Sequence, residues 1–174
     1  YRGIFCDAWR AIDTARSLPG TDPARLAVTG LSQGGALALV GAARREVTAV
    51  AADVPFLCGI EHALEASGIY PYEEIVNLMR RNPESAPLIR ETLPYFDVLG
   101  FAADITAPTL VSVGLEDRRA PPQLARAAFE LIPGHKEWVQ YDAAGHEGGG
   151  WRHDVKKLTW LRGQLKHDAQ PGLA

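Results

Sequence analysis

The chain has 174 residues, a formal net charge of −3, 47% hydrophobic residues and 22% charged residues. This is the length and composition of one ordinary globular domain at most, which excludes a chain that is disordered throughout. The basic residues are scattered and no apolar run approaches the roughly 18 residues that span a bilayer, so we expect neither nucleic acid nor a membrane as a partner.

The first quarter of the chain alternates between helical and strand patterns. Apolar residues at helical spacing predict an amphipathic helix over residues 4–17. A short apolar run over 26–29 predicts a buried strand, followed by a helix of small residues over 36–45 and a second buried strand over 47–54. This order predicts a right-handed parallel strand-helix-strand unit.

The pattern changes over residues from about 56 to 105, where two helical stretches lie between prolines, at 72–81 and at about 84–93. We interpret this segment as a helical insertion in a single domain. The alternation then resumes with a strand at 109–113, a helix at 122–131, a strand at 137–141 and a closing helix over about 153–166. The predicted fold class is therefore α/β, with a mostly parallel sheet and helices on both faces.

The segment Gly30-Leu31-Ser32-Gln33-Gly34 matches the pattern G-x-S-x-G, between a predicted strand and a predicted helix. In that context the motif forms a sharp turn, which we call the elbow, that exposes the hydroxyl of a nucleophilic serine. Larger side chains two positions before or after the serine would collide with the neighbouring strand and helix, so we expect both glycines to be needed. The alternative is a plain turn in which Ser32 caps the helix.

A nucleophilic serine needs a general base and an acid that orients the base. In this fold the order along the chain is Ser, Asp, His, with each residue just after a strand. Asp117 and His146 follow the strands at 109–113 and 137–141 and satisfy that order. Glu116 is an alternative acid, whereas Asp104 precedes its strand and lies on the wrong edge. Parallel strands would bring the three side chains together at their carboxyl ends.

The remaining histidines do not follow a strand in this way, and we expect His62, His135, His153 and His167 to lie on the surface. No spacing typical of a metal site is present, and no cofactor is implied. The two cysteines, Cys6 and Cys58, are too few for a disulfide scaffold. We interpret them as free buried thiols of a reducing compartment and expect a cytoplasmic protein.

With these residues in place, the sequence resembles the family of acetyl xylan esterases and cephalosporin C deacetylases, which are α/β-hydrolases. The resemblance extends over most of the chain, from Tyr1 to about Gly163. It rests on the segments GLSQGG (30–35), ADVPFLC (52–58), ETLPYFDVLGFA (91–102), SVGLEDRRAPP (112–122) and GHEGGG (145–150).

The resemblance implies Ser32 as nucleophile, Asp117 as acid and His146 as base. It also implies that the Gln33 backbone N–H is one donor of the oxyanion hole and that Glu147 has a supporting role. The implied activity is the removal of acetyl groups from small esters, such as acetylated xylo-oligosaccharides or cephalosporin C, and the implied assembly is a homo-oligomer, as in the family's hexamers.

Two features depart from the family. An Arg-Gly-Gln motif and an aromatic residue that completes the oxyanion hole precede the elbow in the family, in a stretch that this chain lacks. The triplet Arg162-Gly163-Gln164 lies on the final helix, and we interpret it as a coincidence. The family also has about eight strands, whereas this chain predicts four. We therefore expect an incomplete domain that lacks its N-terminal strands, the carboxyl-terminal portion of a longer protein.

Two other classes of function stay open on the sequence alone. One is a different carboxylesterase or a peptidase of the same fold. The other is an inactive fragment that serves only as an interaction surface.

Overall fold

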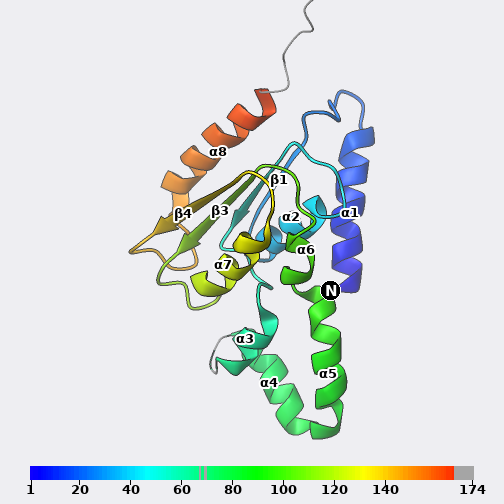
Figure 1. The fold of residues 1–174 in the computed structure, drawn as a ribbon, viewed down its shortest axis with the longest axis vertical. Helices are drawn as coiled ribbons and strands as arrows, with labels where there is room; N and C mark the ends of the chain where they lie inside the picture. Colours follow the sequence, from blue (N-terminus) through cyan, green and yellow to red (C-terminus); the bar gives the residue numbers. More distant parts are fainter. Residues whose placement is uncertain (67, 69, 167–174) are drawn as a thin grey trace, which may run out of the picture.

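A computed structural model describes residues 1–66, 68 and 70–166 of the chain. Its centre is a four-stranded sheet of β1 (Ala27–Leu31), β2 (Ala49–Asp53), β3 (Thr109–Gly114) and β4 (Lys136–Tyr141). All neighbouring strands are parallel and lie in the order of the sequence, β1-β2-β3-β4 (Figure 1). The predicted α/β class with a parallel sheet is confirmed.

Helices cover both faces of the sheet. On one face lie α1 (Arg2–Ser17), α2 (Gln33–Ala42) and α7 (Pro122–Leu131), and α8 (Gly150–Lys166) lies on the other (Figure 1). Successive strand residues point to opposite faces. Accordingly, Val50 and Ala52 of β2 join the larger core beneath α1, α2 and α7, whereas Ala49 and Ala51 pack with Leu161 of α8.

A series of short helices joins β2 to β3. They are α3 (Ile60–Glu65), α4 (Tyr72–Arg81), the 3-10 turn η1 (Pro83–Ser85), α5 (Ala86–Thr92), the 3-10 turn η2 (Leu93–Phe96) and α6 (Leu99–Ala102). Figure 1 shows α3, α4 and α5 as a lobe beyond one end of the sheet. The predicted helix at 72–81 matches α4, but the stretch predicted at about 84–93 is divided. Pro87 has no N–H to donate to the preceding turn, so a new helix starts at Ala86.

A buried carboxylate anchors this lobe to the sheet domain. Asp97 accepts hydrogen bonds from the backbone N–H groups of Gly59 and Ile60, at 3.0 and 2.6 Å, and from the N–H of Leu99 at 2.9 Å. It therefore ties the start of α3 to the start of α6 and satisfies donors that would otherwise lack partners in the interior.

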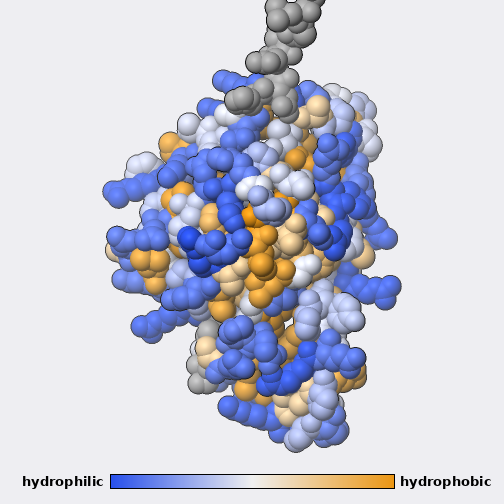
Figure 2. Space-filling model, in the orientation of Figure 1, coloured by the Kyte–Doolittle hydropathy of each residue, from blue (hydrophilic) through white to orange (hydrophobic). Residues whose placement is uncertain are grey.

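Most of the surface seen in Figure 2 is hydrophilic, with apolar residues gathered near the middle of this face. In the described ranges, no helix is both long enough and apolar enough to span a membrane. Both cysteines are free thiols. Cys58 is buried as expected, but Cys6 is only half-buried, because it lies beside the apolar stripe of α1 rather than within it.

Candidate active site

Ser32 lies at the turn between β1 and α2 in a strained backbone conformation, with φ of 57° and ψ of −115°. Such a positive φ is uncommon outside glycine and marks a sharp turn that the surrounding structure must hold. The hydroxyl does not cap α2, so the alternative of a capping serine is wrong.

Two glycines allow this turn, Gly30 and Gly35, and only Gly30 is one of the two that the sequence predicted. A β-carbon at Gly30 would overlap the backbone of Gly34, and one at Gly35 would lie 2.9 Å from the carbonyl oxygen of Asp53. A β-carbon at Gly34 would meet nothing within 4 Å. The expectation that residue 34 must be glycine for steric reasons is therefore wrong. The backbone of Gly34 lies close to Gly30, but a side chain at position 34 would have room.

The Ser32 hydroxyl oxygen lies 2.9 Å from Nε2 of His146, a residue 114 positions away in sequence. On its other side, the imidazole Nδ1 lies 2.8 Å from the Oδ2 atom of Asp117. A carboxylate can only accept, so Nδ1 donates to Asp117 and Nε2 is left to accept the Ser32 O–H. The structure thus brings Ser32, His146 and Asp117 into one hydrogen-bonded chain.

Asp117 is oriented by its own loop just beyond β3. Its Oδ1 atom accepts hydrogen bonds from the N–H groups of Arg119 and Ala120, at 2.8 and 3.0 Å, which leaves Oδ2 for His146. The Asp117 side chain is fully buried, whereas Glu116 is exposed. Of the two candidate acids, it is therefore Asp117 that contacts the histidine.

His146 lies in a turn between β4 and α8. Gly148, Gly149 and Gly150 all have positive φ, so this backbone path suits glycine. Glu147 accepts a hydrogen bond from the N–H of Gly145 at 3.0 Å through its side chain. Through this contact the Glu147 side chain helps to hold the turn that carries His146.

Gln33 is the first residue of α2, so its backbone N–H has no acceptor within the helix. This end of the helix also carries the positive end of the macrodipole. The Gln33 side chain is turned aside, where its Nε2 donates to the hydroxyl of Tyr1 at 3.0 Å. The backbone N–H of Gln33 can therefore donate a hydrogen bond to an anion beside Ser32.

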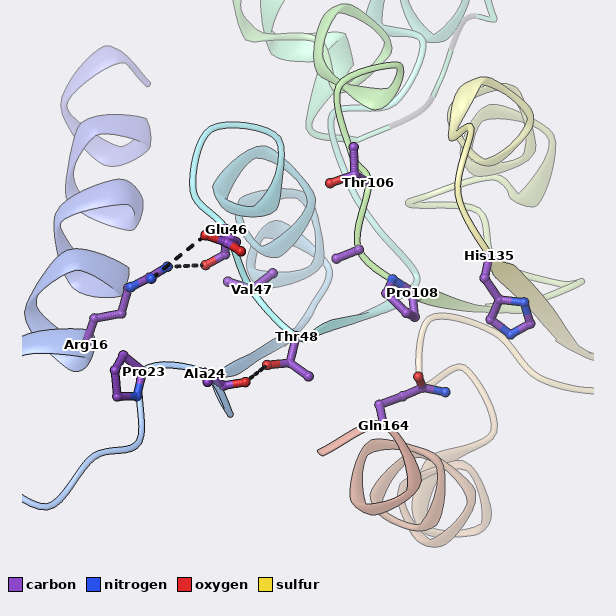
Figure 3. A pocket seen from close by; sticks show the side chains of 11 residues that line it. Arg16, Pro23, Ala24, Glu46, Val47, Thr48, Thr106, Pro108, His135 and Gln164 are labelled. Carbon is purple, nitrogen blue, oxygen red and sulfur yellow. Dashed lines mark hydrogen bonds and ion pairs between the residues drawn. The ribbon is translucent and has the colours of Figure 1, made fainter. Parts of the chain in front are cut away.

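The opposite edge of the sheet holds an open hollow that is not part of this site (Figure 3). Thr48, Pro108 and His135 line it, and each directly precedes a strand. Ser32, Asp117 and His146 each follow a strand and lie at the carboxyl edge. Gln164 also lines the hollow, so the triplet Arg162-Gly163-Gln164 lies at the edge of the sheet far from Ser32. This position agrees with the interpretation of the triplet as a coincidence.

An apolar cavity of about 220 Å³ lies on the side of the elbow that faces the helical lobe. Tyr1, Phe56, Tyr72 and Phe96 contribute aromatic rings to its wall. Phe56 joins it to the elbow, because its N–H donates to the carbonyl oxygen of Ser32 at 3.0 Å. Tyr95, next to Phe96 in sequence, is 73% exposed and does not line the cavity.

A set of interior polar side chains, which we name the buried polar cluster, lies behind the elbow and was not predicted from the sequence. Its members are Asp53, Ser112, Tyr141, His153 and Lys157. The Asp53 Oδ1 atom accepts hydrogen bonds from the Ser112 hydroxyl at 2.9 Å and from His153 Nε2 at 2.7 Å, and Oδ2 accepts one from the Lys157 ammonium at 2.5 Å. His153 Nδ1 lies 3.1 Å from the Tyr141 hydroxyl.

The expectation that His153 lies on the surface is wrong, since it is only 2% exposed. It is in the first turn of α8, on the side that faces the sheet, and the weak periodicity at the start of that helix does not show which side is buried. His62 and His135 are exposed as expected, and His167 lies outside the described residues. The signal that could have found the cluster is Asp53 itself, a carboxylate that ends a buried strand.

The charges of the cluster follow from its contacts. Burial alone would raise the pKa of the Asp53 carboxyl, but the hydrogen bonds from His153, Lys157 and Ser112 outweigh burial and hold that pKa below its ordinary value. Burial alone would lower the pKa of Lys157, but its bonds to Asp53 and Asp154 outweigh burial and raise it. The cluster therefore contains a carboxylate paired with an ammonium ion.

Burial, and to a lesser extent the Asp53 charge, also raise the pKa of the Tyr141 phenol.

Throughout the described part of the chain, His, Cys, Asp and Glu side chains form no group that could hold a metal ion.

The family model for acetyl xylan esterase (AXE1) matches residues 1–164. The chain belongs to the acetyl xylan esterase family. It is 34% identical over 169 residues to the acetyl esterase Axe7A of Xylanibacter ruminicola, a match that covers 94% of this chain and 36% of that protein.

Two solved structures show the same fold. The acetyl xylan esterase from Paenibacillus sp. R4 superposes with a TM-score of 0.88 at 35% identity, over 94% of this chain and 52% of that one. Acetyl xylan esterase 1 from Thermoanaerobacterium sp. JW/SL YS485 gives 0.82 at 29% identity, over 91% and 51%. The chain thus spans between about a third and a half of the length of these acetyl esterases, and its fold is part of an α/β-hydrolase domain.

Proposed function

We propose that the protein is a serine carboxylic-ester hydrolase that removes acetyl groups from small esters. The observation that carries the proposal is the hydrogen-bonded chain from the Ser32 hydroxyl through His146 to Asp117, with distances of 2.9 and 2.8 Å. This arrangement has the geometry by which a serine is activated for acyl transfer. Membership of the acetyl xylan esterase family supports the choice of an acetyl ester.

In the proposed first step, His146 Nε2 takes the Ser32 proton as Oγ attacks the acetyl carbonyl carbon. The carbonyl oxygen becomes an oxyanion that the Gln33 N–H stabilises. Asp117 holds the imidazole in the required tautomer and stabilises its positive charge. The tetrahedral intermediate collapses as the carbon–oxygen bond to the alcohol breaks and His146 returns the proton to the leaving oxygen, which leaves Ser32 acetylated.

In the second step, His146 takes a proton from a water molecule as the water oxygen attacks the carbonyl carbon of the acetyl-serine. The new tetrahedral intermediate expels the Ser32 oxygen, which regains its proton from His146, and acetate departs. Acetylated xylo-oligosaccharides and the acetyl ester of cephalosporin C present the same carbonyl, and we propose this class of small acetate as substrate.

The test is hydrolysis of p-nitrophenyl acetate by the full-length protein and its Ser32→Ala variant. We expect Ser32→Ala to lower turnover by a factor on the order of 10³ or more. A fluorophosphonate probe should label the wild type and not the variant. Unchanged turnover or labelling in Ser32→Ala would rule out Ser32 as the nucleophile.

Acetylated xylo-oligosaccharides, cephalosporin C and a blocked peptide should then be compared as substrates. Release of acetate from either acetyl ester supports the proposal. Cleavage of the peptide without release of acetate would favour a peptidase instead.

A further inference from the structure

The buried polar cluster holds both ends of the loop that carries His146. Tyr141 is the last residue of β4, before the loop, and His153 lies in the first turn of α8, after it. Their side chains meet at 3.1 Å, between the Tyr141 hydroxyl and His153 Nδ1. A β-carbon at Gly149 would overlap the Tyr141 ring, so the end of the loop lies directly against that ring. The contact closes the base of the loop.

The same cluster is joined to the nucleophile. The backbone carbonyl of Asp53 accepts the N–H of Ser32 at 2.8 Å, while its carboxylate accepts His153 Nε2 at 2.7 Å. A single residue at the end of β2 thus contacts both the serine turn and the helix that follows the histidine loop. Val54 adds a second contact, because a β-carbon at Gly148 would come within 2.9 Å of its side chain.

The cluster cannot be a second reaction centre. Asp53 and His153 are only 3% and 2% exposed, so a substrate has no access to them. Nor is it an efficient way to stabilise a fold, since buried ion pairs often contribute less than well-packed apolar side chains would. What a fully satisfied polar network does provide is one defined arrangement of the elements that it joins.

We infer that Asp53 and His153 are positioning residues, which hold the His146 loop at the distance from Ser32 that proton transfer requires. The inference rests on the proposed esterase function. His153 Nε2 donates to the Asp53 carboxylate, and the Nδ1 atom pairs with the Tyr141 hydroxyl, so both ring nitrogens have partners. Lys157 balances the charge of Asp53, to which it is paired.

The experiment replaces His153 in the full-length protein and measures kcat and KM for p-nitrophenyl acetate separately. His153→Leu keeps an apolar body but has no hydrogen-bonding atoms. We expect it to lower kcat by about 10- to 100-fold, because a displacement of about 1 Å in a reacting group has effects of this size, with KM changed by less than about threefold. His153→Gln retains one donor and one acceptor and should keep kcat within about threefold of the wild type.

A matched control is available on the same helix. The Trp160 indole N–H donates to Glu137 at the beginning of β4, at 2.6 Å, and ties α8 to the opposite edge of the sheet. Trp160→Phe removes that bond far from the loop. It should lower the unfolding temperature without changing kcat. All assays are run at a temperature where circular dichroism shows each variant to be folded.

Tyr141→Phe is the second variant, because the buried polar groups that His153→Leu leaves unpaired can prevent folding. Tyr141→Phe preserves the ring against Gly149 and removes only the hydroxyl. We expect a fall in kcat of about fivefold, the effect of one neutral hydrogen bond.

The inference is overturned if folded His153→Leu keeps the wild-type kcat, or if Tyr141→Phe does so when His153→Leu does not fold. It is also overturned if Trp160→Phe lowers kcat as much as they do. The Ser32→Ala variant distinguishes failure of the positioning role from failure of the proposed function. If Ser32→Ala loses turnover while His153→Leu does not, only the positioning role fails, whereas retained turnover in Ser32→Ala removes the proposed function itself.

Discussion

Gly114, the last residue of β3, lies directly against the carbonyl oxygen of Gly145, which immediately precedes His146, with no room for a side chain between them. The loops that carry Asp117 and His146 are joined at this point by their backbones. Leu115 N–H donates to the carbonyl of Tyr141 at 3.0 Å, and Glu116 N–H donates to that of Ala144 at 2.9 Å. The distance between the proposed acid and base is therefore set by contacts between backbones.

Gly114→Ala should separate these two loops. The added methyl group overlaps the Gly145 carbonyl, so the histidine loop must move away from β3. We expect kcat for p-nitrophenyl acetate to fall by about 100-fold and the free energy of unfolding to fall by about 1–3 kcal/mol. Urea unfolding and steady-state kinetics measure the two effects, and an unchanged kcat would show that the loops adapt.

Asp117→Asn should leave the fold intact and lower kcat by roughly 10³- to 10⁴-fold, because an amide no longer holds the imidazole in the tautomer that accepts the serine proton. Glu116→Gln is the matched control at the neighbouring position, where the side chain is exposed. We expect it to retain wild-type kcat. A greater loss in Glu116→Gln than in Asp117→Asn would reverse the assignment of the acid.

The serine turn gives a paired test of the glycines. Gly30→Ala introduces a methyl group that overlaps the Gly34 backbone, and we expect it to lower the free energy of unfolding by about 1–3 kcal/mol. Gly34→Ala points into open space at the start of α2, where alanine is the better helix former. It should be neutral or stabilising by up to about 1 kcal/mol. Thermal unfolding of the two variants ranks them, and equal destabilisation would contradict the geometry.

Asp53→Asn should make stability less sensitive to acid. The pKa of Asp53 in the folded protein is below its ordinary value of 3.8. Its charge therefore stabilises the fold above that value, and this contribution is lost as the pH falls from about 3.8 through the lower folded pKa. At pH 7 we expect Asp53→Asn to lower the free energy of unfolding by about 3–5 kcal/mol, since it leaves Lys157 without its buried partner.

In strong acid that difference should become small, because the wild-type carboxyl is then protonated and uncharged, like the Asn side chain. Urea unfolding of both proteins between pH 2 and pH 7 provides the measurement. A difference that stays constant over this range would mean that the charge of Asp53 does not contribute to stability.

The parallel strands and the candidate site were predictable from the sequence for related physical reasons. Buried parallel strands appear as short apolar runs, and their carboxyl ends lie on one edge of the sheet. Ser32, Asp117 and His146 each follow such a run, so the sequence predicts that they lie on the same edge. The acyl-transfer roles of these residues remain part of the proposal, and the structure adds the hydrogen bonds that join them.

Tertiary structure alone decided what lies behind the site. His153 is part of a helix whose sequence does not show which side meets the sheet, and its partner Asp53 is 100 residues away, so no local pattern joins them. The requirement for Gly35 rather than Gly34 depends likewise on where the carbonyl of Asp53 lies. The periodicity of apolar residues and the order of strands and helices along the chain determined the fold class and the residues at the carboxyl edge of the sheet, because these patterns depend on local burial. The contacts that hold those residues in register depend on distances between strands and helices, which only the packed molecule fixes.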